Sequence, residues 1–150
     1  MATPDLVEGT YVNILVESPA TSDGSGTYVP LCGLTTRTLT EQVNTRDRFT
    51  RDCASPGSIP IRRLINTGKQ WDLSGAGGYN RAQASLVGGL VGERRFYRFA
   101  IGEPADDAVY QSYFQGQARL TQRQITGADD DDVQAELTFA SDGEWDETEV

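Results

Sequence analysis

The sequence has 150 residues, 37% of them hydrophobic, and a net charge of −9. This length predicts one domain, residues 1–150, with a real core. No apolar run approaches the roughly 18 residues of a membrane helix, and the N-terminus lacks a secretory pattern, so we expect no membrane insertion. The chain contains no histidine, which excludes Ser-His-Asp and Cys-His catalysis and nearly all zinc sites. We therefore expect no enzyme, no cofactor and no metal.

Charge is distributed unevenly along the chain. Residues 1–102 carry 11 basic and 9 acidic side chains, whereas residues 103–150 carry 2 and 13. Phosphate affinity needs clustered Lys and Arg, so this balance disfavours a nucleic-acid-binding protein. It favours contact between a basic face of one subunit and an acidic face of the next.

The first half of the chain predicts strands joined by polar loops. β-branched alternation predicts a strand over residues 10–17, and a threonine-rich strand follows over residues 27–40. Residues 45–53 are expected to pair back on the second strand, with a turn near Gln42-Val43. Cys32 and Cys53 would then face each other. A bridge between them is conceivable, and two reduced, partly buried thiols are the simpler interpretation.

Residues 54–63 are rich in Pro, Gly and Ser and predict irregular structure. They and the next residues nevertheless carry too many apolar side chains for an idle loop, so the segment is expected to pack on the domain or on a neighbour. With the arginines around it, it forms a candidate inter-subunit arm over about residues 46–63, whose contact residues are Arg46, Arg48, Arg51, Ile59, Ile61, Arg62, Arg63 and Leu64. A solvated basic face is the alternative interpretation of these arginines.

The centre of the chain predicts a strand, a helix and another strand. Residues 69–75 form a short strand with Trp71 and Leu73 on one face. Residues 79–91 are the one good helix candidate, with apolar residues at helical spacing and Asn80 as N-cap. Gly88-Gly89 weakens this helix. Residues 94–101 return to strand.

The last third of the chain predicts a hairpin. Residues 113–125 and the strictly alternating residues 133–140 flank an acidic turn, and residues 141–150 are expected to be an acidic mobile tail or an arm. The turn lacks the ligand pattern of a calcium loop. Its aspartates are either a solvated turn or, with Glu136, acids that face a lumen or a ring interface: Asp129, Asp130, Asp131, Asp132 and Glu136.

Three groups of residues give the chain a family resemblance. They are residues 34–39 (Leu-Thr-Thr-Arg-Thr-Leu) followed by 43–47, residues 70–77 (Gln-Trp-Asp-Leu-Ser-Gly-Ala-Gly), and the pair 113–121 and 133–139. In this order, with a single helix between them, they resemble the tail tube (major tail) proteins of long-tailed bacterial and archaeal viruses. The resemblance covers about residues 10–143.

The resemblance implies an antiparallel β-sandwich or partial barrel with one short flanking helix and an extended hairpin arm. It implies a virion protein, made in the host cytoplasm, whose hexameric rings stack into a tube that viral DNA passes without specific binding. Its partners would be other copies of the chain and other tail proteins at the tube ends. A monomeric β-sandwich binding module, and a tail terminator or head–tail connector of related fold, are the alternatives.

Overall fold

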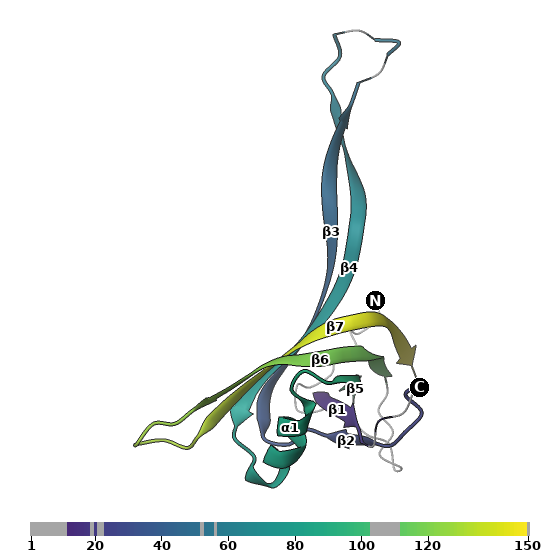
Figure 1. Ribbon diagram of the computed structural model, residues 1–150. Coiled ribbons are helices and arrows are strands. Elements are labelled where there is room, and N and C mark those ends of the chain that lie inside the picture. Colours follow the sequence, from purple (N-terminus) through teal and green to yellow (C-terminus); the bar gives the residue numbers. More distant parts are fainter. Residues whose placement is uncertain are drawn as a thin grey trace, which may run out of the picture.

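The computed structural model describes residues 12–18, 20, 23–51, 53–55, 57–102 and 112–149, with the backbone alone for residue 149. Seven strands and one helical segment follow in chain order (Figure 1): β1 Val12–Glu17, β2 Tyr28–Pro30, β3 Leu34–Thr50, β4 Ile61–Gly78, the 3-10 turn η2 Arg81–Gln83, α1 Ala84–Leu90, β5 Arg94–Ile101, β6 Ser112–Thr126 and β7 Gln134–Glu149. None of the described helices is long and apolar enough to span a membrane.

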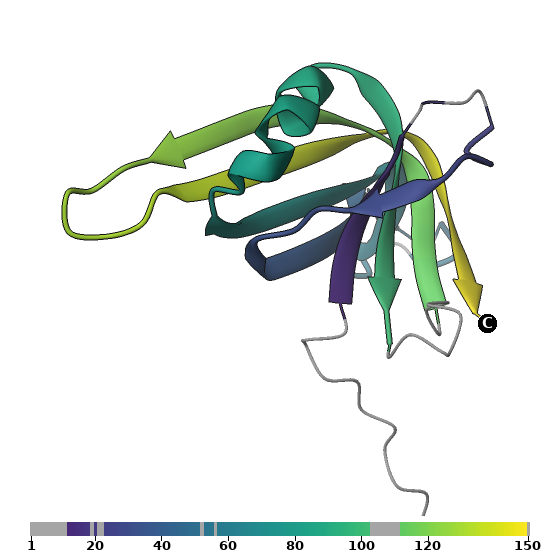
Figure 2. The same ribbon diagram turned by 90° about the horizontal axis from the view of Figure 1, so that it is seen from below.

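All seven strands belong to one antiparallel sheet in the order β2-β1-β5-β6-β7-β4-β3. The sheet curls so that its two ends approach each other, and β1 near one end comes into contact with β3 at the other. Figure 2 shows the strands wrapping around the interior, with α1 lying across one side. The predicted mainly β fold with one short helix is therefore confirmed, and its form is a partial barrel.

The inward-facing side chains of the curled sheet form one hydrophobic core. In β4 the buried positions alternate from Trp71 to Gly77, as a period of two requires. The rings of Tyr97 and Phe139 lie 4.8 Å apart at its centre. The core consists of Ile14, Val16, Leu31, Leu34, Trp71, Leu73, Leu90, Tyr97, Phe99, Ala118, Leu120, Leu137 and Phe139. Each large apolar side chain buried here stabilises the fold by about 1.5–3 kcal/mol.

A capping residue and a pair of glycines set the two ends of the helical segment. The side-chain oxygen of Asn80 accepts a hydrogen bond of 3.1 Å from the amide of Ala82, so the predicted N-cap is confirmed. The expected span of residues 79–91 divides into η2 and the seven-residue α1. Glycine is a poor helix former, and α1 ends at Leu90, directly after Gly88-Gly89.

The predicted first hairpin was wrong. β3 continues through Gln42-Val43 without a turn and pairs along its whole length with β4. The turn signal lies instead in the connection after β3, where Gly57 has a φ of 89°. Cys32 and Cys53 therefore lie beyond opposite ends of a 17-residue strand, about 55 Å in extended length. Both thiols are free and exposed, so neither the conceived bridge nor the expected partial burial is present.

Two other segments are more regular than predicted. Residues 61–63, expected to be irregular, begin β4. Residues 141–149, expected to be a mobile tail or an arm, continue β7 and pair with β6 as far as Ser112↔Glu149. The pairing bulges near Gly143, whose φ is 137°, and the Trp145 ring then packs against the core. This burial outweighs the low strand propensity of the acidic residues around it.

Candidate assembly surfaces

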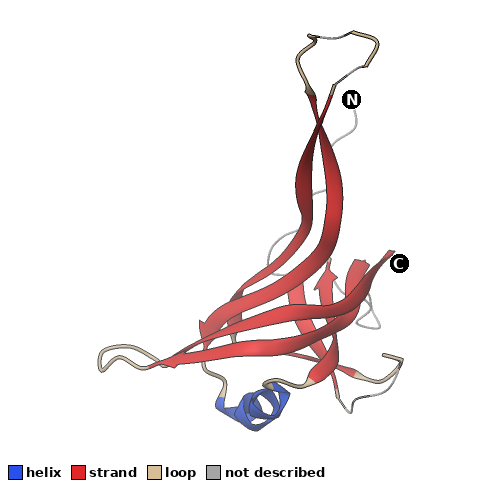
Figure 3. Cartoon of the chain, turned by 45° about the horizontal axis from the view of Figure 1, so that its top comes forward, coloured by secondary structure: helices blue, strands red, loops and turns tan. Residues whose placement is uncertain are grey.

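The longest projection of the molecule is the outer part of the β3–β4 hairpin, which we call the arm (residues 42–70). β4 pairs with β7 only from Asp72 to Gly78, so the part of the hairpin that precedes Asp72 in β4 extends out of the sheet. Figure 1 and Figure 3 show it extending away from the body as a twisted two-stranded ribbon. None of the described residues in the arm is buried, although an isolated two-stranded ribbon is at best marginally stable in water.

Several large apolar side chains of the arm lie in solvent. Ile59 is 87% exposed, Ile61 65%, Phe49 64% and Leu64 55%. Scattered apolar residues on a surface need no explanation, but a contiguous apolar patch indicates an interaction site. All four lie in the outer half of one hairpin, which therefore exposes more apolar surface than isolated residues elsewhere.

The strand register gives the arm two chemically different faces, because directly paired residues share a face. Arg46 pairs with Ile65, Arg48 with Arg63, and Thr50 with Ile61. We call this side the basic face. The other face carries Asp47, Phe49, Arg62 and Leu64, and there Arg62 Nε lies 4.0 Å from the Asp47 carboxylate.

The arm therefore contains all the predicted inter-subunit residues. Arg46, Arg48, Ile61, Arg63, Arg62 and Leu64 lie in its paired strands, whereas Arg51 and Ile59 lie in the connection at its end. The basic face separates Arg46, Arg48 and Arg63 from Arg62, a division that depends on register and was not predicted.

The predicted acidic residues lie at the far end of another projection, which we call the acidic tip (residues 125–133). Asp129–Asp132 connect β6 to β7 and are all exposed, and the amide of Asp132 donates a hydrogen bond of 2.8 Å to the Asp131 carboxylate. Glu136 lies just inside β7, paired with Ala76 and Gln124. In the part of the chain that the structure describes, no three His, Cys, Asp or Glu residues are placed to hold a metal ion.

The apolar side of this hairpin is uncovered near its end. Ile125 and Val133 are 46% and 42% exposed. Ile125 pairs with Ala135, which shares a face of β7 with the buried Leu137. The inward-facing side chains of the hairpin thus continue past the core, where nothing in the described chain covers them. The acidic tip therefore combines four carboxylates with two exposed apolar side chains.

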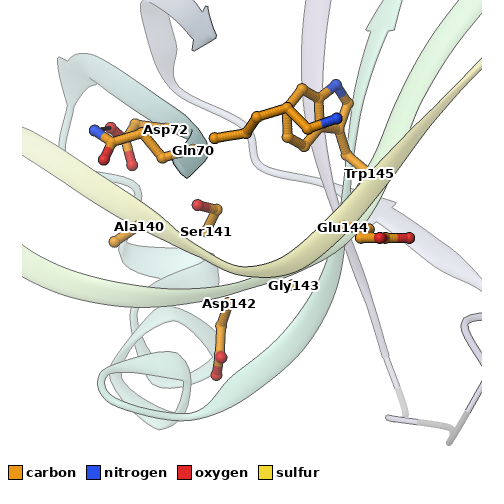
Figure 4. A pocket seen from close by; sticks show the side chains of 9 residues that line it. Gln70, Asp72, Ala140, Ser141, Asp142, Gly143, Glu144 and Trp145 are labelled. Atoms are coloured by element: carbon orange, nitrogen blue, oxygen red, sulfur yellow. Dashed lines mark hydrogen bonds between the residues drawn. The ribbon is translucent and has the colours of Figure 1, made fainter. Parts of the chain in front are cut away.

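A groove that the sequence did not predict lies where β4 and β7 separate (Figure 4). It has a volume of about 1030 Å³ and is lined by Lys69, Gln70, Asp72 and residues 140–145. Trp145 Nε1 donates a hydrogen bond of 3.1 Å to Glu41 Oε1, and Lys69 Nζ lies 5.8 Å from the centre of the Trp145 ring. The groove is open and polar, and it holds no evident reactive group.

One carboxylate beside the groove is engaged in the body. Asp142 points away from Gln70 and Asp72 in Figure 4. Its carboxylate accepts a hydrogen bond of 2.8 Å from Arg119 Nε and lies 3.4 Å from Arg94 Nε. The Arg119 hydrogen bond, with the charges of both arginines, lowers the pKa of Asp142 below its usual value. Asp142 thus links the bulged part of β7 to β6 through Arg119 and to β5 through Arg94.

A stacked arginine fastens the loop before β2. The Arg98 guanidinium lies 3.8 Å from the ring centre of Tyr28 and 4.4 Å from that of Tyr113. The Tyr28 hydroxyl donates a hydrogen bond of 2.7 Å to the carbonyl of Gly24. Burial raises the pKa of Tyr28 to about 12, against the opposing effect of Arg98. These contacts hold the loop on the sheet.

Comparison with known proteins identifies the fold. No protein-family model matches the chain, and no curated protein matches its sequence. A chain from the tail of an empty gene transfer agent (GTA) particle, computed with C6 symmetry, is 21% identical, with a TM-score of 0.70 over 94% of this chain and 98% of that chain.

Two further structures agree. A chain from the native GTA virion is 19% identical, with a TM-score of 0.71 over 94% of this chain and 98% of that one. A chain of the SPP1 tail tube is 11% identical, with a TM-score of 0.66 over 97% of this chain and 80% of that one. At such identities the similarity establishes the fold, so the resemblance to tail tube proteins is confirmed in the architecture of the chain.

Proposed function

We propose that this chain is the tail tube subunit of a phage-like particle, a virion protein with a structural and not a catalytic role. Its copies assemble into hexameric rings, and the rings stack into a tube through which DNA passes. The observation that carries this proposal is the arm, a long hairpin whose apolar side chains find no cover within their own chain. Such a ribbon gains its stability when another molecule covers it.

The edges of the sheet support the same proposal. β2 and β3 are the two edge strands, and β3 offers an unpaired edge along much of its 17 residues. Exposed edges of this length invite pairing with another chain, and closure into a barrel removes them. Neighbouring subunits that share their sheets around a ring would close these edges together.

Charge and symmetry fit a conduit for DNA. A net charge of −9 repels the phosphate backbone, so nucleic acid would pass without specific binding. The similar chain from the GTA tail belongs to a structure with C6 symmetry, which supports six subunits per ring. The partners are further copies of the chain along the tube and other tail proteins at its ends.

Negative-stain electron microscopy of the purified protein tests the proposal. The informative variant lacks residues 47–64 and joins Arg46 to Ile65, a directly paired position, through Asn-Gly, which suits a two-residue hairpin turn. We expect tubes from the wild-type chain at high protein concentration and none from the variant. Circular dichroism and urea unfolding would show that the variant body remains folded, because none of the described residues of the arm is buried. Wild-type protein that stays monomeric at every concentration and ionic strength would contradict the proposal and favour a binding module.

A tail terminator is the second candidate. A chain from a structure of an extracellular contractile injection system, the PVC sheath/tube terminator, is 10% identical, with a TM-score of 0.65 over 98% of this chain. The fold alone therefore fits both roles. The same micrographs separate them, since a terminator forms single closed rings whereas a tube subunit forms stacks of variable length.

A further inference from the structure

The basic face of the arm holds two like charges directly opposite each other. Arg48 pairs with Arg63 across the ladder, and Arg46 lies on the same face. Among the described residues, none of the three has a carboxylate within 4.0 Å. Opposed like charges destabilise an antiparallel pair, so the arm is more stable when an anionic group lies against this face.

The acidic tip has the complementary chemistry. Four adjacent aspartates repel one another there, beside the exposed Ile125 and Val133. The basic face likewise has an apolar component, because Ile61 lies on it with 65% of its surface exposed. The two surfaces therefore match in charge and also in their apolar content.

These two surfaces cannot meet within one molecule. Arg63 lies near the start of β4, and Gly78 at its end pairs with Gln134 at the base of the acidic tip. The intervening strand is about 50 Å long in extended form. Figure 3 shows the two hairpins projecting from the body in different directions. An occupant of the basic face must therefore come from another molecule.

We propose that the basic face of the arm binds the acidic tip of a second copy of this chain, a contact that rests on the proposed function and assigns its partner surface. Arg48 and Arg63 meet the carboxylates of the tip, and Ile61 packs against Ile125 and Val133. Burial of the apolar residues supplies the attraction, and the charges set orientation and partner choice. Because the two surfaces differ, the contact is head-to-tail and passes from one subunit to the next.

Charge reversal tests this pairing. The arm variant carries Arg48→Glu and Arg63→Glu, and the tip variant carries Asp129→Lys and Asp130→Lys. All four side chains are exposed, so both variants should fold as monomers. In each variant alone, every contact between arm and tip brings the two reversed side chains against like charges. We expect each to raise the protein concentration needed for assembly at least about tenfold, since several attractive pairs become repulsive.

Mixing the two variants is the decisive step. In an equimolar mixture the new glutamates in the arm of one variant meet the new lysines in the tip of the other, and the unchanged arm meets the unchanged tip. Assembly should therefore return in the mixture. A control variant keeps the arm changes Arg48→Glu and Arg63→Glu and adds Asp146→Lys and Glu147→Lys, at exposed positions near the far end of β7. It therefore introduces the two new lysines away from the tip and has no basic arm with which to assemble alone. Mixed with the arm variant, this control should not restore assembly.

The outcomes separate the pairing from the proposed function. Light scattering and electron microscopy that show assembly in the first mixture alone support the pairing. If the wild type forms tubes but the mixture shows no rescue, or the control rescues equally well, the proposed pairing is wrong and the proposed tube function still stands. If the wild type forms no tubes, the proposed function fails, and sedimentation of the mixture still measures whether arm and tip associate. Binding of a duplex oligonucleotide that the arm variant abolishes, without rescue, would assign the basic face to nucleic acid instead.

Discussion

The two halves of β4 belong to one unbroken strand but differ in burial and in the number of strands beside them. From Trp71 to Gly77, buried and half-buried positions alternate, and β7 and β3 flank the strand on both sides. From Ile61 to Gln70, every position is exposed or half-buried, and β3 is its sole neighbour in the sheet. The lower half is stabilised by the core, whereas the upper half has little to stabilise it.

This difference suggests that the lower half stabilises the monomer and that the upper half serves association. Substitutions in the lower half should act on the stability of the monomer, because they change packing in the core. Substitutions in the upper half should act on association, because none of its side chains is buried in the monomer. The predictions below either separate these two effects or show that the division is wrong.

The largest effect is expected at the centre of the core. Phe139 is fully buried and packs on Tyr97, so Phe139→Ala should lower the free energy of unfolding by about 3–5 kcal/mol. Phe49→Ala is the matched control in the arm, where the ring is 64% exposed. It should change stability by no more than about 0.5 kcal/mol. Urea unfolding of the monomers measures both, and equal losses would remove the distinction between body and arm.

A smaller effect is expected from added volume at Gly77. A Cβ there would collide with the carbonyl oxygen of Gly33 and would lie 2.7 Å from the amide nitrogen of Thr35. Both are backbone atoms that cannot turn aside, so Gly77→Ala should cost about 1–3 kcal/mol. At Gly68, in the arm, the nearest atom to an added Cβ is 3.8 Å away. Gly68→Ala should therefore be nearly neutral, and thermal melts of the two variants should differ clearly.

Tyr28→Phe should cost less again. The variant loses the hydrogen bond to Gly24, which contributes about 0.5–1.5 kcal/mol. The pKa of Tyr28 is raised from 10.0 to about 12, so the folded state favours the neutral phenol. Its contribution is complete below pH 10 and is lost as the pH rises through about 12. The stability difference between wild type and variant should shrink over that interval, and a constant difference would contradict this account of the loop.

The smallest effect is expected at Asp142, on the surface of the body. Its pKa is lowered from 3.8, chiefly by the hydrogen bond from Arg119, so the folded state favours the ionised carboxylate. The stabilisation is present above the unfolded value and is lost as the pH falls through the folded one. Asp142→Asn should lower Tm slightly at pH 7, with the difference disappearing below the folded pKa. Asp47→Asn in the arm, whose exposed carboxylate is 4.0 Å from Arg62, should shift Tm even less.

The body of the molecule could largely be predicted from sequence because its residues alternate. The predicted strand at residues 94–101 coincides with β5, and the face of Trp71 and Leu73 and the Asn80 cap are as expected. The C-terminal hairpin was also found from its period of two. In each case one face is buried, and burial is what imposes the pattern that the sequence displays.

The arm and the end of β7 could not be predicted in this way. Residues 41–50 of β3 are exposed on both faces. The sequence there has no alternation of apolar and polar residues, so the length of the strand could not be predicted. Around Trp145 the sequence is acidic and shows no strand pattern, yet these residues form a strand because they pair with β6. The residues predicted to make contacts were chosen for their chemistry. Their division into two faces depends on register, and a shift of one residue would exchange the faces.

Cryo-electron microscopy of the assembled wild-type protein tests the central claim most directly. We expect a hollow six-fold tube in which the arm of each subunit lies against the acidic tip of a subunit in contact with it. Tubes with the arm in solvent would contradict the account of the arm. Particles that never exceed a monomer, at any concentration or ionic strength, would contradict the proposed function itself.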